Sequence, residues 1–155
     1  MKKKIAILGS TGSIGKSTLE VVKKNLKNFD IILLSANNNY KELIKQAKYF
    51  NPKNVLITNK KFYEKVKSSL IKKRTKVYYG NASIENIISQ KLDYTMSAIV
   101  GIAGLQPTID SIKLSKVVAL ANKESIICGW DILSRLAKKY KTTILPVDSE
   151  HFSIR

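Results

Sequence analysis

Residues 5–15 read Ile-Ala-Ile-Leu-Gly-Ser-Thr-Gly-Ser-Ile-Gly, an apolar run that leads directly into three glycines, Gly9, Gly12 and Gly15. The apolar run predicts a buried strand, and the residues behind the glycines follow a helical pattern. Glycines at such a turn accept positive φ angles and allow a ligand close to the backbone. The unpaired amides and the positive dipole end of the next helix favour an anion. We therefore expect this turn to hold the phosphates of a nucleotide.

Two nucleotide-binding motifs match this turn imperfectly. A P-loop, G-x-x-x-x-G-K-[ST], needs a glycine five residues before Gly15, and Ser10 stands there instead. The dinucleotide fingerprint needs G-x-G-x-x-G, whereas the glycines here are spaced G-x-x-G-x-x-G. A glycine-rich turn without a ligand is a third interpretation, so the rest of the chain has to decide among them.

Length and composition favour a globular domain. The chain has 155 residues, of which 44% are hydrophobic, enough for one domain with a sizeable core. Lysines at positions 2–4 precede an apolar run of four residues, which is too short for a signal peptide, and no segment reaches membrane-spanning length. The single cysteine, Cys128, fits a reducing compartment. We expect a cytoplasmic protein with no membrane partner.

The formal net charge of +17 raises the alternative of a basic nucleic-acid-binding module. Such a module would gather arginines and aromatic residues in one patch. Here the lysines are scattered along the chain, and the only arginines are Arg74, Arg135 and Arg155. We interpret the charge as solvated helix faces and expect no nucleic-acid partner.

Apolar runs alternate with helical patterns along the chain, which is typical of crossover units in a parallel sheet. The runs predict strands near residues 4–8, 30–35, 54–58, 76–79, 94–99, 116–120 and 142–147. Apolar residues at helical spacing predict core-facing stripes, the longest being Ile126, Ile127, Trp130, Leu133, Leu136 and Ala137. We expect an α/β fold of the Rossmann-like, doubly wound kind, with a mainly parallel sheet and a site at the carboxyl ends of its strands.

The second expected strand is followed by Asn37, Asn38 and Asn39. NAD-binding domains usually carry an acidic residue here, which accepts hydrogen bonds from the ribose 2′-hydroxyl. Amides with Lys41 nearby would instead tolerate a 2′-phosphate, so the position favours NADP. The alternative is that the asparagines simply form a tight turn, because asparagine tolerates the left-handed conformation.

The sixth expected strand leads into Asn122, Lys123 and Glu124 at the start of a helix. Asn122 can cap that helix, and Glu124 suits its first turn. The positive charge of Lys123 opposes the helix dipole at this end. A phosphate or carboxylate ligand nearby would explain the lysine better than helix stability does.

The last expected strand delivers Asp148 and Glu150, which project to one side if the backbone stays extended. Two carboxylates in this arrangement suit a hard divalent cation such as Mg²⁺ or Mn²⁺. The alternative is a solvated acidic turn. His151 next to them is the only histidine of the chain, and its role stays open.

Taken together, four motifs closely resemble the N-terminal half of the 1-deoxy-D-xylulose 5-phosphate reductoisomerase family. They are GSTGSIG at 9–15, AIVG at 98–101 with Gly104-Leu105 and Pro107-Thr108, LANKES at 120–125, and PVDSEH at 146–151. They occur in the order and approximate spacing of that family and cover the chain from residue 4 to residue 151.

The resemblance implies an NADPH- and divalent-metal-dependent enzyme of non-mevalonate isoprenoid biosynthesis. Such an enzyme converts the phosphorylated sugar 1-deoxy-D-xylulose 5-phosphate to 2-C-methyl-D-erythritol 4-phosphate, and the full-length protein is expected to be a homodimer. Residues 1–143 would be its NADPH-binding domain and residues 144–155 the start of a catalytic domain, which carries the third metal ligand. The chain alone is therefore expected to be inactive.

By position, the resemblance also implies the roles of individual residues. The cofactor phosphates would contact Thr11, Gly12, Ser13 and Ile14, the adenosine ribose phosphate would contact Asn37, Asn38 and Asn39, and Asn122 and Glu124 would line the cofactor. Lys123 and Ser149 would contact the substrate, Asp148 the metal, and Glu150 both. The catalytic residues in this chain would be Lys123, Asp148 and Glu150.

A P-loop-type nucleotide hydrolase is the leading alternative function. Gly15, Lys16 and Ser17 would then contact the phosphates, and Asp148 would be the metal-binding partner at the end of an apolar strand. The misplaced glycine argues against it, and the basic nucleic-acid-binding module is the non-enzymatic alternative.

Overall fold

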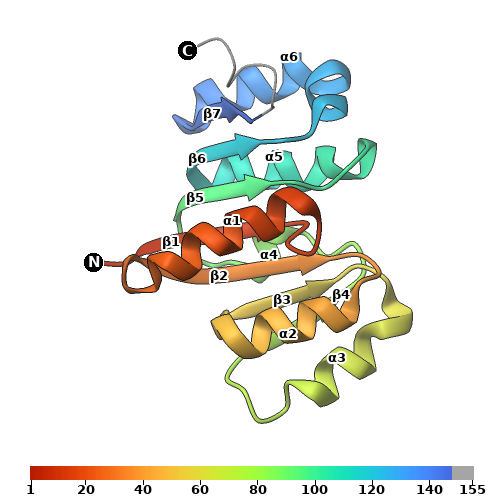
Figure 1. Ribbon diagram of the computed structural model, residues 1–155. Helices are drawn as coiled ribbons and strands as arrows, with labels where there is room; N and C mark the ends of the chain where they lie inside the picture. Colours follow the sequence, from red (N-terminus) through yellow and green to blue (C-terminus); the bar gives the residue numbers. More distant parts are fainter. Residues whose placement is uncertain (148–155) are drawn as a thin grey trace.

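Seven strands form one sheet in the computed structural model, which describes residues 1–147 (Figure 1). The strand order is β4-β3-β2-β1-β5-β6-β7, and every pairing in the described part is parallel. The strands are β1 (Lys3–Leu8), β2 (Phe29–Ala36), β3 (Asn54–Ile57), β4 (Lys76–Tyr79), β5 (Leu92–Ser97), β6 (Ser115–Leu120) and β7 (Thr143–Pro146). This confirms the expected α/β, Rossmann-like fold and its seven strand positions.

Helices cover both faces of the sheet, as a doubly wound fold requires. They are α1 (Ser13–Lys24), α2 (Tyr40–Phe50), α3 (Tyr63–Ser69), α4 (Ile84–Ile87), α5 (Leu105–Leu114) and α6 (Lys123–Tyr140). Short 3₁₀ turns occur at η1 (Leu26–Asn28), η2 (Lys60–Phe62) and η3 (Ile102–Gly104). In Figure 1, α1, α2 and α3 lie in front of the sheet, and α4 and α5 lie behind it.

The core is divided between the two faces because successive side chains of a strand point in opposite directions. In β1, Ile5 and Ile7 pack with α1 and α2, whereas Ala6 and Leu8 pack on the α4 side. A third cluster joins α5 and α6 to β6 through Ile112, Leu120 and Leu133. Since both faces are buried, the central strands read as continuous apolar runs.

The stripe expected on α6 is partly wrong. Ile127 is 81% exposed and Trp130 is 50% exposed, so neither belongs to the core. Instead, the buried line of α6 runs through Ser125, Gly129 and Leu133. Gly129 lies so close to α5 that an added Cβ would stand 2.6 Å from Leu105 Cδ1. The helix approaches α5 at Gly129, and three of its bulky apolar side chains, Ile127, Trp130 and Ile132, are exposed instead.

Strand β7 pairs with β6 from Thr143 to Pro146. The sheet therefore extends past residue 143. The division into residues 1–143 and residues 144–155 stays a prediction. Among the helices of residues 1–147, none combines the length and the hydropathy needed to cross a membrane.

Candidate functional site

The sheet reverses its winding between β1 and β5, and ligands of doubly wound folds bind outside the carboxyl ends of the strands at this point. The connections after β1, β2, β5 and β6 meet there. Ser10 N donates to Ser35 O at the end of β2, and Ala98 N donates to Leu8 O at the end of β1. The glycine-rich turn is therefore the centre of this edge.

The three glycines of the turn have different roles. Gly9 has φ +74°, and an added Cβ would stand 2.6 Å from Ala98 O, so both its conformation and its packing require glycine. At Gly15 an added Cβ would collide with Gly9 O and with Ser10 Cα. Gly12 is different because its φ is an ordinary −76° and an added Cβ would meet only Gly9 O, at 3.4 Å. Only Gly12 thus leaves open space on its outer side.

Gly12 is also the N-cap of α1, which begins without a capping side chain and without an acidic residue in its first turn. The first amides of a helix have no partner within it, and they carry the positive end of the helix dipole. Gly12, Ser13 and Ile14 are exposed, and Thr11 is half-buried. The structure thus brings these four predicted phosphate-contacting residues together at an open helix N-terminus.

Behind the turn lies a buried polar cluster that the sequence analysis missed. The Ser10 hydroxyl donates to Gln46 Oε1 at 2.7 Å, and Gln46 Nε2 donates to Ser10 O at 2.9 Å. From β2, the Ser35 hydroxyl accepts a hydrogen bond from Gly9 N at 3.1 Å. Ser10, Ser35 and Gln46 are each at most 5% exposed. The available signal was Gln46 itself, a polar residue in the buried stripe of Leu43 and Ala47.

The asparagine loop after β2 is exposed and contains no carboxylate. Asn38 Oδ1 accepts a hydrogen bond from Asn59 Nδ2 at 2.8 Å, and Asn39 caps α2 by accepting one from Glu42 N at 3.2 Å. None of the three asparagines has a positive φ, so the left-handed tight turn is not what they form. The loop is instead fixed by its side chains to α2 and to the β3–α3 connection.

Asn122 holds a second loop of the same edge. Its side chain is 2% exposed, donates to Ile99 O and to Gly101 O, the latter at 2.7 Å, and accepts from Ser125 N at 2.6 Å. The expected cap of α6 is confirmed, and the same amide ties α6 to the β5–α5 connection. Lys123 and Glu124 are exposed in the first turn of α6.

The expected metal-binding residues Asp148 and Glu150, together with Ser149 and His151, lie outside the described residues. Within residues 1–147 no three metal-ligating side chains gather in one place.

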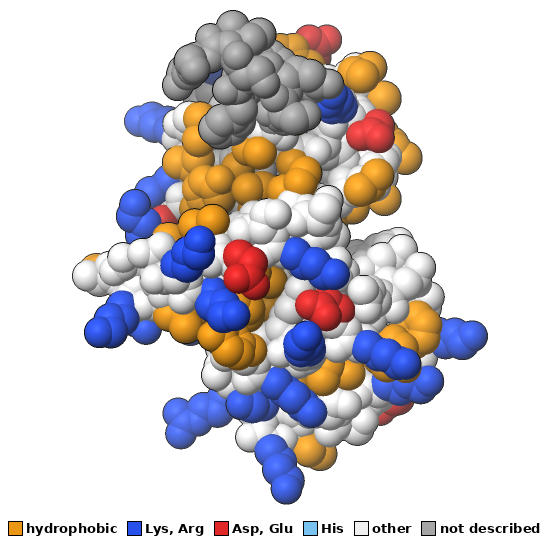
Figure 2. Space-filling view, in the orientation of Figure 1, with side chains coloured by type: hydrophobic (Ala, Val, Ile, Leu, Met, Phe, Trp, Pro, Cys, Tyr) orange, Lys and Arg blue, Asp and Glu red, His pale blue; other side chains and the backbone are white. Residues whose placement is uncertain are grey.

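Positive charge is spread over the face formed by α1, α2 and α3, with acidic side chains among the lysines (Figure 2). Two shallow depressions on this side, each with three lysines in its lining, belong to α2 and to the end of α3 with the residues after it. Neither of them touches the glycine turn, so the candidate site is the open carboxyl edge of the sheet.

Comparison with known proteins identifies the family. The family model of 1-deoxy-D-xylulose 5-phosphate reductoisomerase matches residues 5–129. The protein of that name from Pelagibacter ubique (strain HTCC1062) is 53% identical over 154 residues, which are 98% of this chain and 40% of that protein.

Solved structures agree with the sequence comparison. The reductoisomerase from Zymomonas mobilis in complex with NADPH superposes with a TM-score of 0.92 at 38% identity, covering 97% of this chain and 40% of that one. A DOX-P reductoisomerase in complex with NADPH, fosmidomycin and magnesium gives a TM-score of 0.89 at 33% identity, covering 96% and 37%. The chain thus spans about 40% of the length of these relatives. Since the family model covers both the glycine turn and the Asn122 cap, the chain belongs to the 1-deoxy-D-xylulose 5-phosphate reductoisomerase family.

Proposed function

We propose that the chain is the NADPH-binding part of an enzyme that converts 1-deoxy-D-xylulose 5-phosphate to 2-C-methyl-D-erythritol 4-phosphate. The observation that carries the proposal is the open N-terminus of α1 at the switch point of the sheet, in a chain of this family. Relatives solved in complex with NADPH support the choice of cofactor.

The described residues fit NADPH. The uncapped first turn of α1 and the open side of Gly12 suit the pyrophosphate, so Thr11, Gly12, Ser13 and Ile14 would hold it. Asn37, Asn38 and Asn39 would face the ribose 2′-phosphate, since no carboxylate of the loop repels it. When bound, NADPH would supply the hydride for a reduction.

For the substrate side, the proposal rests on the family resemblance. Lys123 and Ser149 would contact the phosphorylated sugar, Asp148 and Glu150 would hold Mg²⁺ or Mn²⁺, and Asn122 and Glu124 would line the cofactor. A divalent ion there would act as a Lewis acid on the substrate oxygens. The side-chain amide of Asn122 also fixes the neighbouring loop through Ile99 O and Gly101 O. A homodimeric full-length enzyme and a cytoplasmic location are further parts of the proposal.

Titration calorimetry with NADPH and NADH tests the cofactor assignment. We expect NADPH to bind more tightly, by a modest margin because no arginine clamps the 2′-phosphate in the loop. The variant Asn37→Asp places a carboxylate beside the ribose and is expected to reverse the preference. Asn86→Asp on α4 makes the same change of charge at an exposed position of the opposite face and should leave it unchanged. Tighter binding of NADH to the unmodified chain would contradict the assignment.

An NADPH-oxidation assay tests whether the chain binds the cofactor but needs the rest of the full-length enzyme for catalysis. With 1-deoxy-D-xylulose 5-phosphate and Mn²⁺ we expect no turnover by the 155-residue chain. The chain spans about 40% of the length of its relatives, and a metal held loosely by two carboxylates polarises a carbonyl poorly. A full-length relative should turn over under the same conditions and lose activity when the carboxylate equivalent to Asp148 is changed to an amide. Measurable turnover by the chain alone would refute this part of the proposal.

A further inference from the structure

We infer that Gln46 is a positioning residue that holds the phosphate-binding turn and the asparagine loop at a fixed separation. The inference rests on the proposed binding of NADPH. Gln46 is a buried side chain of α2 and would not touch the cofactor itself. It would determine whether the pyrophosphate and the 2′-phosphate of one NADPH molecule can be bound at the same time.

The first step is the contact between Gln46 and the turn. The side-chain amide of Gln46 makes two hydrogen bonds with Ser10. Its Oε1 accepts from the Ser10 hydroxyl at 2.7 Å, and its Nε2 donates to the Ser10 carbonyl at 2.9 Å. Ser10 is 0% exposed and stands two residues before Gly12. A pair of hydrogen bonds of opposite direction fixes the position of the turn more firmly than one bond does.

The second step is the rigid connection from Gln46 to the asparagine loop. Gln46 lies about two helical turns after Asn39, the N-cap of α2. The cap is closed by Glu42 N on the Asn39 side chain and by Leu43 N on Asn39 O, at 3.2 Å and 3.1 Å. Helix α2 therefore joins the loop proposed for the 2′-phosphate to the turn proposed for the pyrophosphate, and Gln46 is the point where the helix contacts the turn.

The third step separates this role from ordinary core packing. Gly9 and Ser10 are already held to the sheet by Ser35, through its hydroxyl and its carbonyl. The contact with Gln46 is thus not needed to keep the turn on β2, but it sets the turn relative to α2. Besides Ser10, Gln46 Nε2 approaches Glu42 Oε1 at 3.5 Å, a contact within α2 itself. Loss of the amide would leave β1 and β2 in place and release the turn from the helix.

The test compares two ligands and two buried amides. Gln46→Leu should raise the Kd for NADPH about tenfold, the equivalent of one lost buried hydrogen bond. The Kd for adenosine 2′-monophosphate, measured by ligand-observed NMR, should change less than about twofold, because this ligand reaches only the loop carried by α2. A loss of fold would weaken both ligands alike.

Asn54→Leu is the matched control. Asn54 is a buried amide, 8% exposed, that donates to Ile32 O at 3.0 Å from the first residue of β3, at the opposite edge of the sheet. It should lower the melting temperature to a similar extent and leave both Kd values unchanged. Ser10→Ala removes the hydroxyl contacts with Gln46 Oε1 and with Ser35 O but keeps the hydrogen bond from Gln46 Nε2 to Ser10 O. It should weaken NADPH binding less than Gln46→Leu does.

The outcomes distinguish the inference from the function on which it rests. If the unmodified chain does not bind NADPH, the proposed function fails and the inference fails with it. If the unmodified chain binds NADPH but Gln46→Leu keeps its affinity within about twofold, only the inference is overturned. Equal weakening by Gln46→Leu and Asn54→Leu would also overturn it, since the effect would then be one of general stability.

Discussion

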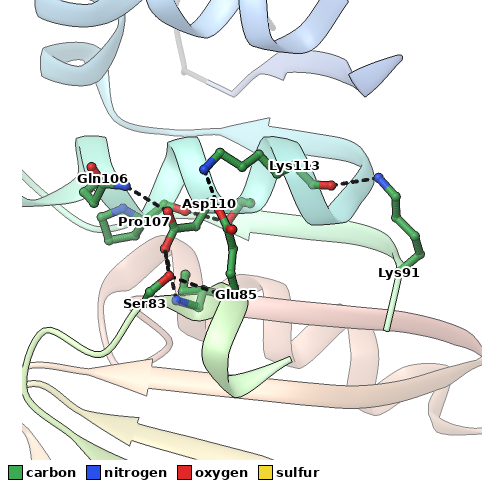
Figure 3. A network of polar contacts seen from close by, with 9 residues as sticks. Ser83, Glu85, Lys91, Gln106, Pro107, Asp110 and Lys113 are labelled. Atoms are coloured by element: carbon green, nitrogen blue, oxygen red, sulfur yellow. Dashed lines mark hydrogen bonds and ion pairs between the residues drawn. The ribbon is translucent and has the colours of Figure 1, made fainter. Parts of the chain in front are cut away.

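The first backbone amides of a helix need an acceptor from outside the helix. Two helix N-termini on opposite faces of the sheet, those of α4 and α1, differ in whether the chain itself supplies one. At α4, Ile84 N donates to Asp110 Oδ2 at 3.0 Å, and Ser83, the N-cap, donates its hydroxyl to the same oxygen at 2.8 Å (Figure 3). At α1, Gly12 offers no side chain, and the first turn contains no acid. The chain thus supplies its own anion where a helix only packs and leaves the position open where a phosphate is proposed to bind.

The α4 region is closed further by neighbouring contacts. Gln106 donates to Asp110 Oδ1 at 2.8 Å, and Lys113 Nζ lies 2.6 Å from Glu85 Oε1 (Figure 3). The hydrogen bond to Glu85 raises the pKa of the Lys113 ammonium above its ordinary value. Asp110 is 3% exposed, whereas Gly12 and Ser13 at α1 are open to solvent. The comparison predicts that changes near α4 alter stability and that changes near α1 alter affinity.

The largest effect is expected for Asp110→Ala. The variant leaves a backbone amide and two side-chain donors without their acceptor, which should cost about 3 kcal/mol of unfolding free energy. Chemical denaturation measures this loss, and the Kd for NADPH at a temperature where the variant is folded should stay unchanged. Asp131→Ala, at an exposed position of α6, should cost less than about 0.5 kcal/mol. If Asp110→Ala lowered the affinity for NADPH, the α4 region would not act on stability alone, and the contrast between α4 and α1 would be wrong.

The next effect is expected for Gly12→Val. Its side chain would occupy the open space in front of the first turn of α1, so the Kd for NADPH should rise at least about fiftyfold, or about 2.3 kcal/mol. The unfolding free energy should change by less than about 1 kcal/mol, since the added Cβ meets only Gly9 O at 3.4 Å.

Gly15→Ala is the matched control for Gly12→Val. It adds a Cβ against Gly9 O and Ser10 Cα, so it should destabilise the fold by about 1–3 kcal/mol. If Gly12→Val bound NADPH like the unmodified chain, the open helix terminus would not be the phosphate site.

The smallest effect concerns Asp93, which contacts a backbone amide as Asp110 does, but near the surface. Its carboxylate accepts from Lys116 Nζ at 2.8 Å and from Lys4 N at 2.9 Å, and these contacts hold the pKa of Asp93 below its ordinary value. The contribution of the Asp93 carboxylate to the unfolding free energy is therefore complete above the pKa that Asp93 has in the unfolded chain. It is lost as the pH falls through the pKa of Asp93 in the folded chain.

Asp93→Asn should cost at most about 1 kcal/mol at neutral pH, because the ion pair is largely solvated. The difference from the unmodified chain should shrink as the pH is lowered below about 4. Urea denaturation at a series of pH values measures it. A difference that grew on acidification would mean that the contacts favour the protonated carboxyl.

The sequence predicts the sheet well and the site only in part. Each strand is a short apolar run between polar segments, and parallel strands buried on both faces produce that local signal. The contacts of Gln46 with Ser10 and of Asp110 with Ser83 span 36 and 27 residues, so no local pattern contains them. Glycine spacing located the turn, but it could not separate Gly12, which faces open space, from Gly9 and Gly15, which face backbone.

The outward orientation of part of α6 has a practical consequence for spectroscopy. Trp130 is the only tryptophan of the chain, and it is half exposed near Ile127 on that helix. Its fluorescence emission therefore reports the polarity at one known surface position. A protein segment that covered this side of α6 would shift the emission to shorter wavelengths, without any label and without a change in the core.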